Sequence, residues 1–452
     1  MAEQMMQHKP AKQTIPAGYK QTEVGVIPED WDVKSIGETM TLINGYGFKP
    51  YQWMREGLPI IRIQNLNDDD APFNYYDGIV DSRFYINEGD LLFAWSGSKG
   101  SSFGARVWSG PRAILNQHIF KVVANNSFVE SDFAYLILRS VQEDIEKKAH
   151  GFKSSFVHVK KGDLENTELP IPPKQEQTAI ANVLLDSDAL IDALEQLIAK
   201  KQAIKTAVMQ QLLTGRARLP QFALRPDGTP KGYKTSELGQ IPEDWDALTY
   251  GDIFTFLSTA TNSRADLSNS GDFGYIHYGD IHTKWNNKLD LCVFDLPRVS
   301  RHLVSSSFVE NGDVIMADAS EDYDGIGKSV EICNVGDDKI VSGLHTFLLR
   351  DKNKLLVDGY RGFLHSIPAV KKAFDRLATG MKVYGISKNN LIVVPVPLPP
   401  KQEQTAIATI LTDMDSELTA LEQKLAKARD VKQGMMQQLL TGRIRLPLPQ
   451  EA

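Results

Sequence analysis

The chain has 452 residues, of which 42% are hydrophobic and 24% are charged, and its formal net charge is −7. Its two cysteines are too few for a disulfide framework or a cysteine-rich zinc site, and no apolar run is long enough for a transmembrane helix. The acidic balance argues against a protein that coats nucleic acid indiscriminately, although a specific DNA-binding protein needs basic groups only locally. The first residues lack the apolar core of a signal peptide, so we expect a cytoplasmic protein of roughly two to four domains without a membrane segment.

The polar first stretch predicts a disordered tail over residues 1–17. The motif Ile-Pro-Glu-Asp-Trp follows at residues 27–31 and returns at residues 241–245, an offset of 241 − 27 = 214. We interpret the chain as a tandem duplication in which each half consists of a globular region and then a helix. Trp31 and Trp245, which end the two motifs, are expected to anchor the cores of the two regions.

The first globular region, predicted over residues 18–171, contains short β-rich runs separated by turn residues, and a helical pattern follows near residues 133–148. The second region, predicted over residues 235–398, repeats this order, with its helical pattern near residues 360–377. Both are expected to be strand-rich α+β domains. Their ends are alike and their interiors differ, which is typical of a recognition module with a fixed frame and a variable reading surface. Drift after duplication is the alternative.

The stretch Pro-Pro-Lys-Gln-Glu-Gln-Thr-Ala-Ile-Ala occurs twice, at residues 172–181 and 399–408. Each copy leads to the same ending, Gln-Gln-Leu-Leu-Thr-Gly-Arg, at residues 210–216 and 437–443. The starts have an offset of 399 − 172 = 227 and the endings 437 − 210 = 227, so the two segments have equal length. Between start and ending, apolar residues recur at steps of three and four, as in a heptad seam.

These segments predict a central helix over residues 172–216 and a C-terminal helix over residues 399–446, with a linker over 217–234 and a tail over 447–452. Because the linker is short, we expect the second helix to pack antiparallel against the first and to relate the two halves by a pseudo-twofold axis. About 40 residues at a rise of 1.5 Å give a rod of roughly 60 Å. An ordinary helix buried on a globular core is the alternative for either copy.

Residues at both ends of the segments support the helix prediction. Paired prolines precede each helix, where a missing N–H costs nothing in the first turn, and Gly215 and Gly442 stand where a left-handed C-cap would fall. In the first helix, Ser187, Lys201 and Lys205 interrupt the apolar seam. We therefore expect that part of the helix pair to be packed less tightly.

The repeated helix starts and endings, together with the two Ile-Pro-Glu-Asp-Trp motifs, resemble the specificity subunit of type I restriction-modification enzymes over residues 18–446. The resemblance implies that two target recognition domains each read one half of a split double-stranded DNA site. It implies that the helix pair sets their spacing and docks two methyltransferase subunits, through which restriction subunits join. The chain itself would be a non-catalytic subunit without a cofactor. S-adenosylmethionine would belong to the adenine-methylating subunits, and ATP and magnesium to the restriction subunits.

Motifs of catalysis are missing from the sequence itself. No Asn/Asp-Pro-Pro-Tyr motif for adenine methylation occurs, and no Gly-rich cofactor loop follows a strand. The run at residues 324–329 is similar to the end of a P-loop, but Asp322 stands where the first glycine belongs. No second ligand recurs near the lone histidines at a spacing that fits a metal site. Two alternatives stay open: a bilobed scaffold without a DNA role, and an enzyme with a diverged active site.

We predict DNA contacts at polar residues in loops that follow strands, because such side chains reach base edges and phosphates. In the first domain these residues are Arg62, Gln64, Asn65, Ser96, Ser98, Lys99, Ser101, Ser102, Lys153, Ser154 and Ser155. In the second domain they are His277, Asp280, Asp318, Ser320, Tyr323, Lys382 and Tyr384. The alternative for each is a solvated loop side chain. Because the two sets differ in chemistry, the sequence predicts two different half-sites.

Two histidines occupy equivalent positions in the halves. His118 and His345 are related by the offset 345 − 118 = 227. Because both halves carry the residue although their interiors differ, we interpret the two histidines as structural groups of the cores.

Overall fold

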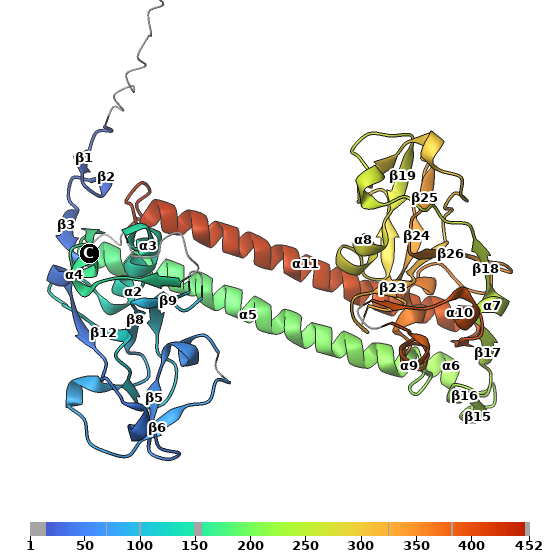
Figure 1. The fold of residues 1–452 in the computed structure, drawn as a ribbon, viewed down its shortest axis with the longest axis horizontal. Coiled ribbons are helices and arrows are strands. Elements are labelled where there is room, and N and C mark those ends of the chain that lie inside the picture. Colours follow the sequence, from blue (N-terminus) through green and yellow to red (C-terminus); the bar gives the residue numbers. More distant parts are fainter. Residues whose placement is uncertain are drawn as a thin grey trace, which may run out of the picture. The chain divides into compact units, whose positions relative to one another are not determined.

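The computed structural model describes residues 15–68, 70–98, 101–148, 156–323, 325–380 and 383–447 (Figure 1). The chain divides into two compact units, Met1–Leu194 with Lys424–Ala452, and Glu195–Gln423. Each unit contains one globular region, the beginning of one long helix and the end of the other. Most of the two predicted tails lies outside the described residues.

A four-stranded antiparallel sheet with the order β10–β8–β12–β4 forms the centre of the first globular region. Its strands are β4 (Met40–Asn44), β8 (Leu91–Ala94), β10 (Gly104–Val107) and β12 (Ile119–Ala124). All four residues of β8 are buried. Leu91 and Phe93 belong to one apolar cluster and Leu92 and Ala94 to another, so both faces of this sheet are covered.

A second sheet and a helix provide the two covers. The second sheet has the order β6–β5–β11–β7, and β5 and β11 run parallel. Its strands are β5 (Leu58–Ile61), β6 (Asn74–Tyr76), β7 (Tyr85–Ile86) and β11 (Ala113–Leu115). Ile61 and Leu115 from this sheet pack with Leu92, whereas Phe133 from helix α2 (Ser131–Ser140) packs with Phe93. The strand-rich α+β prediction is confirmed.

Shorter elements complete the first unit. Strand pairs are formed by β1 (Tyr19–Thr22) with β2 (Gly25–Pro28), β3 (Asp32–Ser35) with β14 (Glu168–Ile171), and β9 (Ser96–Ser98) with β13 (Phe156–His158). The short helices are α1 (Ile36–Thr39), α3 (Gln142–Lys148), α4 (Lys161–Glu165), η1 (Pro50–Gln52), η2 (Ile63–Leu66) and η3 (Ser82–Phe84). The single helix expected near 133–148 is therefore two helices, α2 and α3.

The second globular region repeats this plan, but its main sheet has one strand more and its smaller sheet one strand fewer. Its main sheet has the order β18–β26–β22–β24–β20, in which β20 pairs parallel with β24 at the edge. These strands are β18 (Phe254–Leu257), β20 (Lys288–Asp290), β22 (Val314–Ala317), β24 (Ser329–Cys333) and β26 (Thr346–Asp351). A three-stranded sheet of β21 (Arg298–Val299), β19 (Phe273–Ile276) and β25 (Ile340–Ser342) again contains one parallel pair, β19 with β25.

The remaining elements of the second unit are short. Strand pairs are formed by β15 (Tyr233–Ser236) with β16 (Gly239–Pro242), β17 (Asp246–Thr249) with β28 (Pro395–Leu398), and β23 (Ala319–Ser320) with β27 (Tyr384–Gly385). The helices are α6 (Pro220–Ala223), α7 (Tyr250–Ile253), α8 (Tyr278–Thr283), α9 (Pro368–Leu377), α10 (Lys388–Leu391), η4 (Arg264–Asp266), η5 (Arg301–Leu303) and η6 (Arg361–Ser366). The helix expected near 360–377 is thus divided between η6 and α9.

Two uninterrupted helices of 39 residues each, α5 (Lys174–Leu212) and α11 (Lys401–Leu439), correspond to the repeated segments (Figure 1). They begin directly after the paired prolines and end before Gly215 and Gly442, both of which have the predicted left-handed conformation. Their ends join the globular cores. In the first unit the core contains Ile180 from α5 and Leu439 from α11, and in the second it contains Leu212 from α5 and Ile407 from α11.

Candidate nucleic-acid interface and the framework that carries it

The repeated Gln-Glu-Gln sequence attaches each long helix to its globular region. Gln177 is buried; its amide group donates to Phe128 O and Pro172 O at 2.8 and 2.9 Å, and its side-chain oxygen accepts from Glu130 N. Gln404 makes the equivalent bonds in the second unit, to Leu355 O, Pro399 O and Val357 N. These bonds satisfy backbone groups that would otherwise be unpaired beside a helix start.

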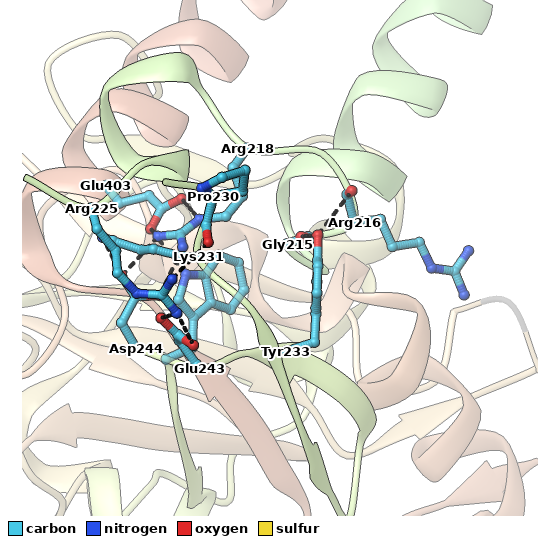
Figure 2. Close-up of polar contacts among 11 residues, drawn as sticks. Gly215, Arg216, Arg218, Arg225, Pro230, Lys231, Tyr233, Glu243, Asp244 and Glu403 are labelled. Atoms are coloured by element: carbon cyan, nitrogen blue, oxygen red, sulfur yellow. Dashed lines mark hydrogen bonds and ion pairs between the residues drawn. The ribbon is translucent and has the colours of Figure 1, made fainter. Parts of the chain in front are cut away.

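The glutamates of the same repeat hold a buried ion cluster. In the second unit, Glu403 accepts from the indole of Trp245 at 2.9 Å and from Arg218 at 2.5 Å, and Arg218 also forms two bonds with Asp244 (Figure 2). Burial lowers the pKa of Arg218, but the hydrogen bonds to Glu403 and Asp244 outweigh this effect and raise it above its ordinary value. In Figure 2 the neighbouring Arg216 side chain points away from the cluster.

The first unit contains the same cluster, built from the other end of the chain. Glu176 accepts from Trp31 at 3.0 Å and from Arg445 at 2.6 Å, and Arg445 binds Asp30 at 2.9 and 2.8 Å. Arg218 follows α5 and Arg445 follows α11, so each helix ends on the region from which the other helix starts. Both tryptophans are fully buried, as the sequence predicted.

Two buried lysines pair the long helices within the units. Lys205 Nζ binds Asp415 in the second unit, and Lys432 Nζ binds Asp188 in the first. The repeat relates the two pairs, since 432 − 205 = 227 and 415 − 188 = 227. An unpaired buried ammonium group costs several kcal/mol, so these pairs oppose any slip in helix register. We expected Lys205 to interrupt the packing between the helices. Instead it forms an ion pair across the seam, with Asp415.

Arg62 is the best-placed DNA candidate of the first domain. It follows β5, its guanidinium lies over the Trp53 ring at 4.9 Å, and Nη1 donates to Asn74 Oδ1 at 2.9 Å. Gln64 is exposed next to it. Asn65, in contrast, is buried, and its amide donates to Ala71 O at 3.1 Å, so this prediction of a base contact is wrong for the described structure.

Only some of the serines in the loop after Trp95 are exposed enough to contact DNA. Ser96 and Ser102 are buried, and the hydroxyl of Ser102 accepts from Ser98 N at 2.8 Å, so these two serines shape the loop and do not reach outward. Ser101 is exposed and Ser98 is partly exposed. The predictions that fall outside the described residues are Lys99, Lys153, Ser154, Ser155 and Lys382.

Two histidines that were not predicted to contact DNA lie against Trp95, at the start of the serine-rich loop. The Trp95 ring contacts the rings of His118 and His158 at centroid distances of 5.3 and 4.7 Å. Both histidines are exposed, so the expectation that His118 is a core group is wrong. Burial of part of the ring, and then the charges of His158 and Arg62, lower the pKa of His118. Arg62, His118 and His158 thus lie close together, with the charge of the Arg62 guanidinium beside two exposed imidazole rings.

In the second domain, two residues that were predicted to contact DNA are buried, and two that were not predicted are exposed. His277 and Asp280 are buried and cannot face a DNA groove. Arg264 and Lys284, which sequence reasoning missed, are exposed, and both bind Asp280 Oδ1, at 2.9 and 3.1 Å. Arg264 begins the short helix η4 and does not follow a predicted strand, so the rule that selected polar residues in loops after strands could not find it.

The other candidates of the second domain have mixed exposure. Ser320 is buried, and its hydroxyl accepts from Asp322 N, so it is a loop-shaping group and not a DNA contact. Tyr323 is exposed, and its ring lies against that of the partly buried Tyr384, with the ring centroids 4.0 Å apart and the planes tilted by 34°. Burial raises the pKa of Asp318, whose carboxylate lies 3.4 Å from His345. His345 is exposed, so its predicted place in the core is also wrong.

The described part of the chain contains neither a metal-binding cluster nor a membrane-spanning helix. No group of three or more His, Cys, Asp or Glu side chains there could hold a metal ion. No described helix is long and apolar enough to cross a membrane.

The family model described as "Type I restriction modification DNA specificity domain" matches the chain twice, over residues 28–206 and 242–428. The type I restriction enzyme MjaVIII specificity subunit of Methanocaldococcus jannaschii is 24% identical over 429 residues, 93% of this chain and 94% of the relative. The EcoBI specificity subunit of Escherichia coli is 26% identical over 264 residues, 56% of this chain and 50% of the relative.

The fold also resembles solved structures. The S subunit of a type I restriction-modification system from M. genitalium aligns over 90% of this chain and 96% of its own, with a TM-score of 0.54 and 17% identity. A chain from a structure that describes complex assembly and conformational transition of the type I R-M system aligns over 92% of this chain and 99% of its own, with a TM-score of 0.52 and 16% identity.

Proposed function

Since this chain belongs to the type I restriction-modification DNA specificity family and is a specificity subunit with two recognition domains, we propose that each domain reads one half of a bipartite double-stranded DNA target. The observation that carries this proposal is the contrast between the repeats. The family model matches each half, yet the surface groups differ, with the partly exposed Arg62 and the exposed His118 in one half and the exposed Arg264 and Lys284 in the other. Two unlike surfaces on one frame fit two unlike half-sites.

The long helices serve, in this proposal, as the docking element for two methyltransferase subunits. Ile204 on α5 and Val431 on α11 are exposed apolar residues, and the repeat relates them by 431 − 204 = 227. Equivalent apolar positions on the two helices suit two copies of one partner. The ion pairs of Lys205 and Lys432 would hold the register on which the spacing between half-sites depends.

The chemistry is assigned to the partners. We place S-adenosylmethionine and adenine methylation in the methyltransferase subunits, and ATP and magnesium in restriction subunits that bind through them. The chain itself acts as a non-catalytic subunit in the cytoplasm. The missing adenine-methylation and P-loop motifs in the sequence support this division of roles.

Methylation mapping tests the proposal. The chain is co-expressed with a methyltransferase subunit, and host DNA is sequenced by a method that detects methyladenine. We expect a motif with two specified halves and an unread gap. A stable complex that adds no methylated motif would overturn the proposal in favour of a scaffold without a DNA role. Binding of the complex to target DNA should also weaken steeply with salt, because phosphate contacts release counterions.

A further inference from the structure

The geometry points to Asp280 as a positioning residue that holds Arg264 for the recognition of guanine by the second domain, with Lys284 beside it for a phosphate. This inference rests on the proposed function and deepens it, since it names one base and the residues that select it. It starts from a buried carboxylate that binds two exposed cations.

Asp280 is fixed by the fold. It lies in α8, directly after β19, whose four residues are buried and whose parallel partner is β25. The residue is only 2% exposed, and the side chain of His277 accepts from Gly279 N at 3.0 Å at the start of the same helix. A carboxylate in such a place has little freedom to move toward DNA, but it can orient a longer side chain that extends over it.

Arg264 is that longer side chain. Its Nη2 atom contacts Asp280 Oδ1 at 2.9 Å and His277 Nδ1 at 3.2 Å. Because His277 Nδ1 also accepts from Gly279 N, this nitrogen carries no proton, and burial together with the charge of Arg264 lowers the pKa of His277. A neutral histidine and an anionic carboxylate therefore hold one nitrogen of the guanidinium from two directions.

The rest of the guanidinium is available. The Arg264 side chain is 54% exposed, and in the described part of the chain all of its hydrogen bonds are made by Nη2. The N–H groups of Nε and Nη1 are therefore free to donate to a ligand. Because both guanidinium forks include Nη2, which is bound to Asp280 and His277, the contact left to this side chain is made by Nη1, whose two N–H groups are held in a fixed orientation and can donate to the O6 and N7 acceptors of guanine in the major groove. Lys284, 53% exposed, presents a compact charge that suits a phosphate.

Asp280 holds both cations through one of its two oxygens. Both cations bind Oδ1, while Oδ2 is buried and accepts no hydrogen bond from the described residues. Burying such an atom without a partner is unfavourable.

The equivalent position of the first domain carries an uncharged residue, Asn65, in place of Asp280. Asn65 follows β5 as Asp280 follows β19, with an offset of 280 − 65 = 215, and it is buried as well. Its amide binds the backbone of its own loop, and Arg62 is held by Trp53 and Asn74 instead. The frame therefore needs a polar group here but no charge. The acid of the second domain is explained by the arginine that it orients.

The test is methylation mapping with the full chain assembled with its methyltransferase subunits. Arg264→Lys keeps the charge and removes the oriented planar guanidinium, and Asp280→Asn keeps the shape and removes the charge. We expect both to relax one and the same guanine position in one half-site, with a loss of discrimination of about 5-fold to about 150-fold. Lys284→Gln is the matched control, and it should weaken methylation of all sites without changing the motif.

The outcomes separate the inference from the proposed function. If the unmodified chain directs no bipartite methylation, the proposed function fails and this inference fails with it. If it directs bipartite methylation but Arg264→Lys leaves every position of the motif as strict as before, or weakens all positions equally, the inference alone is overturned. Because the Arg264 side chain is largely exposed, Arg264→Lys should fold, which thermal unfolding and assembly with the methyltransferase subunits verify.

Discussion

The two halves of the chain place the same residues at the ends of the long helices and different residues on the surfaces that follow the strands. Glu176 and Glu403 bind a tryptophan and an arginine in the same way. Arg62 and Arg264, in contrast, are held by unrelated neighbours. The difference teaches that the frame depends on a few buried polar contacts that each half requires, whereas the loops between these contacts are free to vary in chemistry.

Removing an arginine of the helix-end clusters should have the largest effect on stability. Arg218→Ala leaves Glu403 buried without its cation, which costs about 3–5 kcal/mol for a buried pair. Arg445→Ala should cost clearly less, because the Arg445 side chain is 38% exposed and that of Arg218 is 5% exposed. Urea unfolding of the full chain measures both. Equal costs would show that exposure does not distinguish the two clusters.

The buried lysines sharpen the comparison because the repeat relates them. Lys205→Met should destabilise the chain by about 3 kcal/mol, since it leaves Asp415 without its partner inside the helix pair, and Lys432→Met should have a similar effect through Asp188. The double variant Lys205→Met with Asp415→Leu should recover most of the loss. If it is no more stable than the single variant, the ion pair is not what Lys205 contributes.

The halves should also respond differently to acid. Burial lowers the pKa of His365 to about 4, while Leu138 occupies the equivalent place in the first half, since 365 − 138 = 227. Between pH 6.5 and pH 4 the unfolded chain binds a proton that the folded chain does not, so stability falls as the pH falls through this window, by at most about 3 kcal/mol. His365→Leu should flatten that loss in unfolding measured across the window. An unchanged pH profile would contradict this assignment.

The smallest of these effects is expected at the helix C-caps. Gly215→Ala should cost more than about 1–2 kcal/mol, because the residue has φ +68° and a Cβ atom there would lie 2.5 Å from Pro242. Gly228→Ala is the matched control, with φ +84° and no neighbour within 4 Å, so it carries the conformational cost alone. Thermal unfolding compares the two. If Gly228→Ala lowers stability more than Gly215→Ala does, the clash with Pro242 does not add to the cost of the Gly215 substitution.

Much of the frame could be predicted from sequence because identical residues recur at fixed offsets. The helices predicted over 172–216 and 399–446 appear as Lys174–Leu212 and Lys401–Leu439. The ion pair of Lys205 could not be predicted, because a heptad pattern shows an interruption but not the partner that satisfies it. The boundaries assigned to the two recognition domains stay predictions.

The surfaces were less accessible to sequence reasoning. Asn65, Ser102 and Asp280 are polar residues in loops, but each turns inward to bind backbone or a neighbouring cation. Sequence gives the polarity of a loop residue and not the direction of its side chain. Arg264 was missed for the complementary reason, since its position depends on a buried acid that lies 16 residues further along the chain.

The most direct test of the account is a chain in which residues 235–398 are replaced by a second copy of residues 18–171, co-expressed with the methyltransferase subunit. If each domain reads its own half-site on a pseudo-twofold frame, the methylated motif should change to two identical, inverted halves separated by a gap. A complex that assembles and still methylates the original unlike halves would contradict the claim that the two domains read DNA independently.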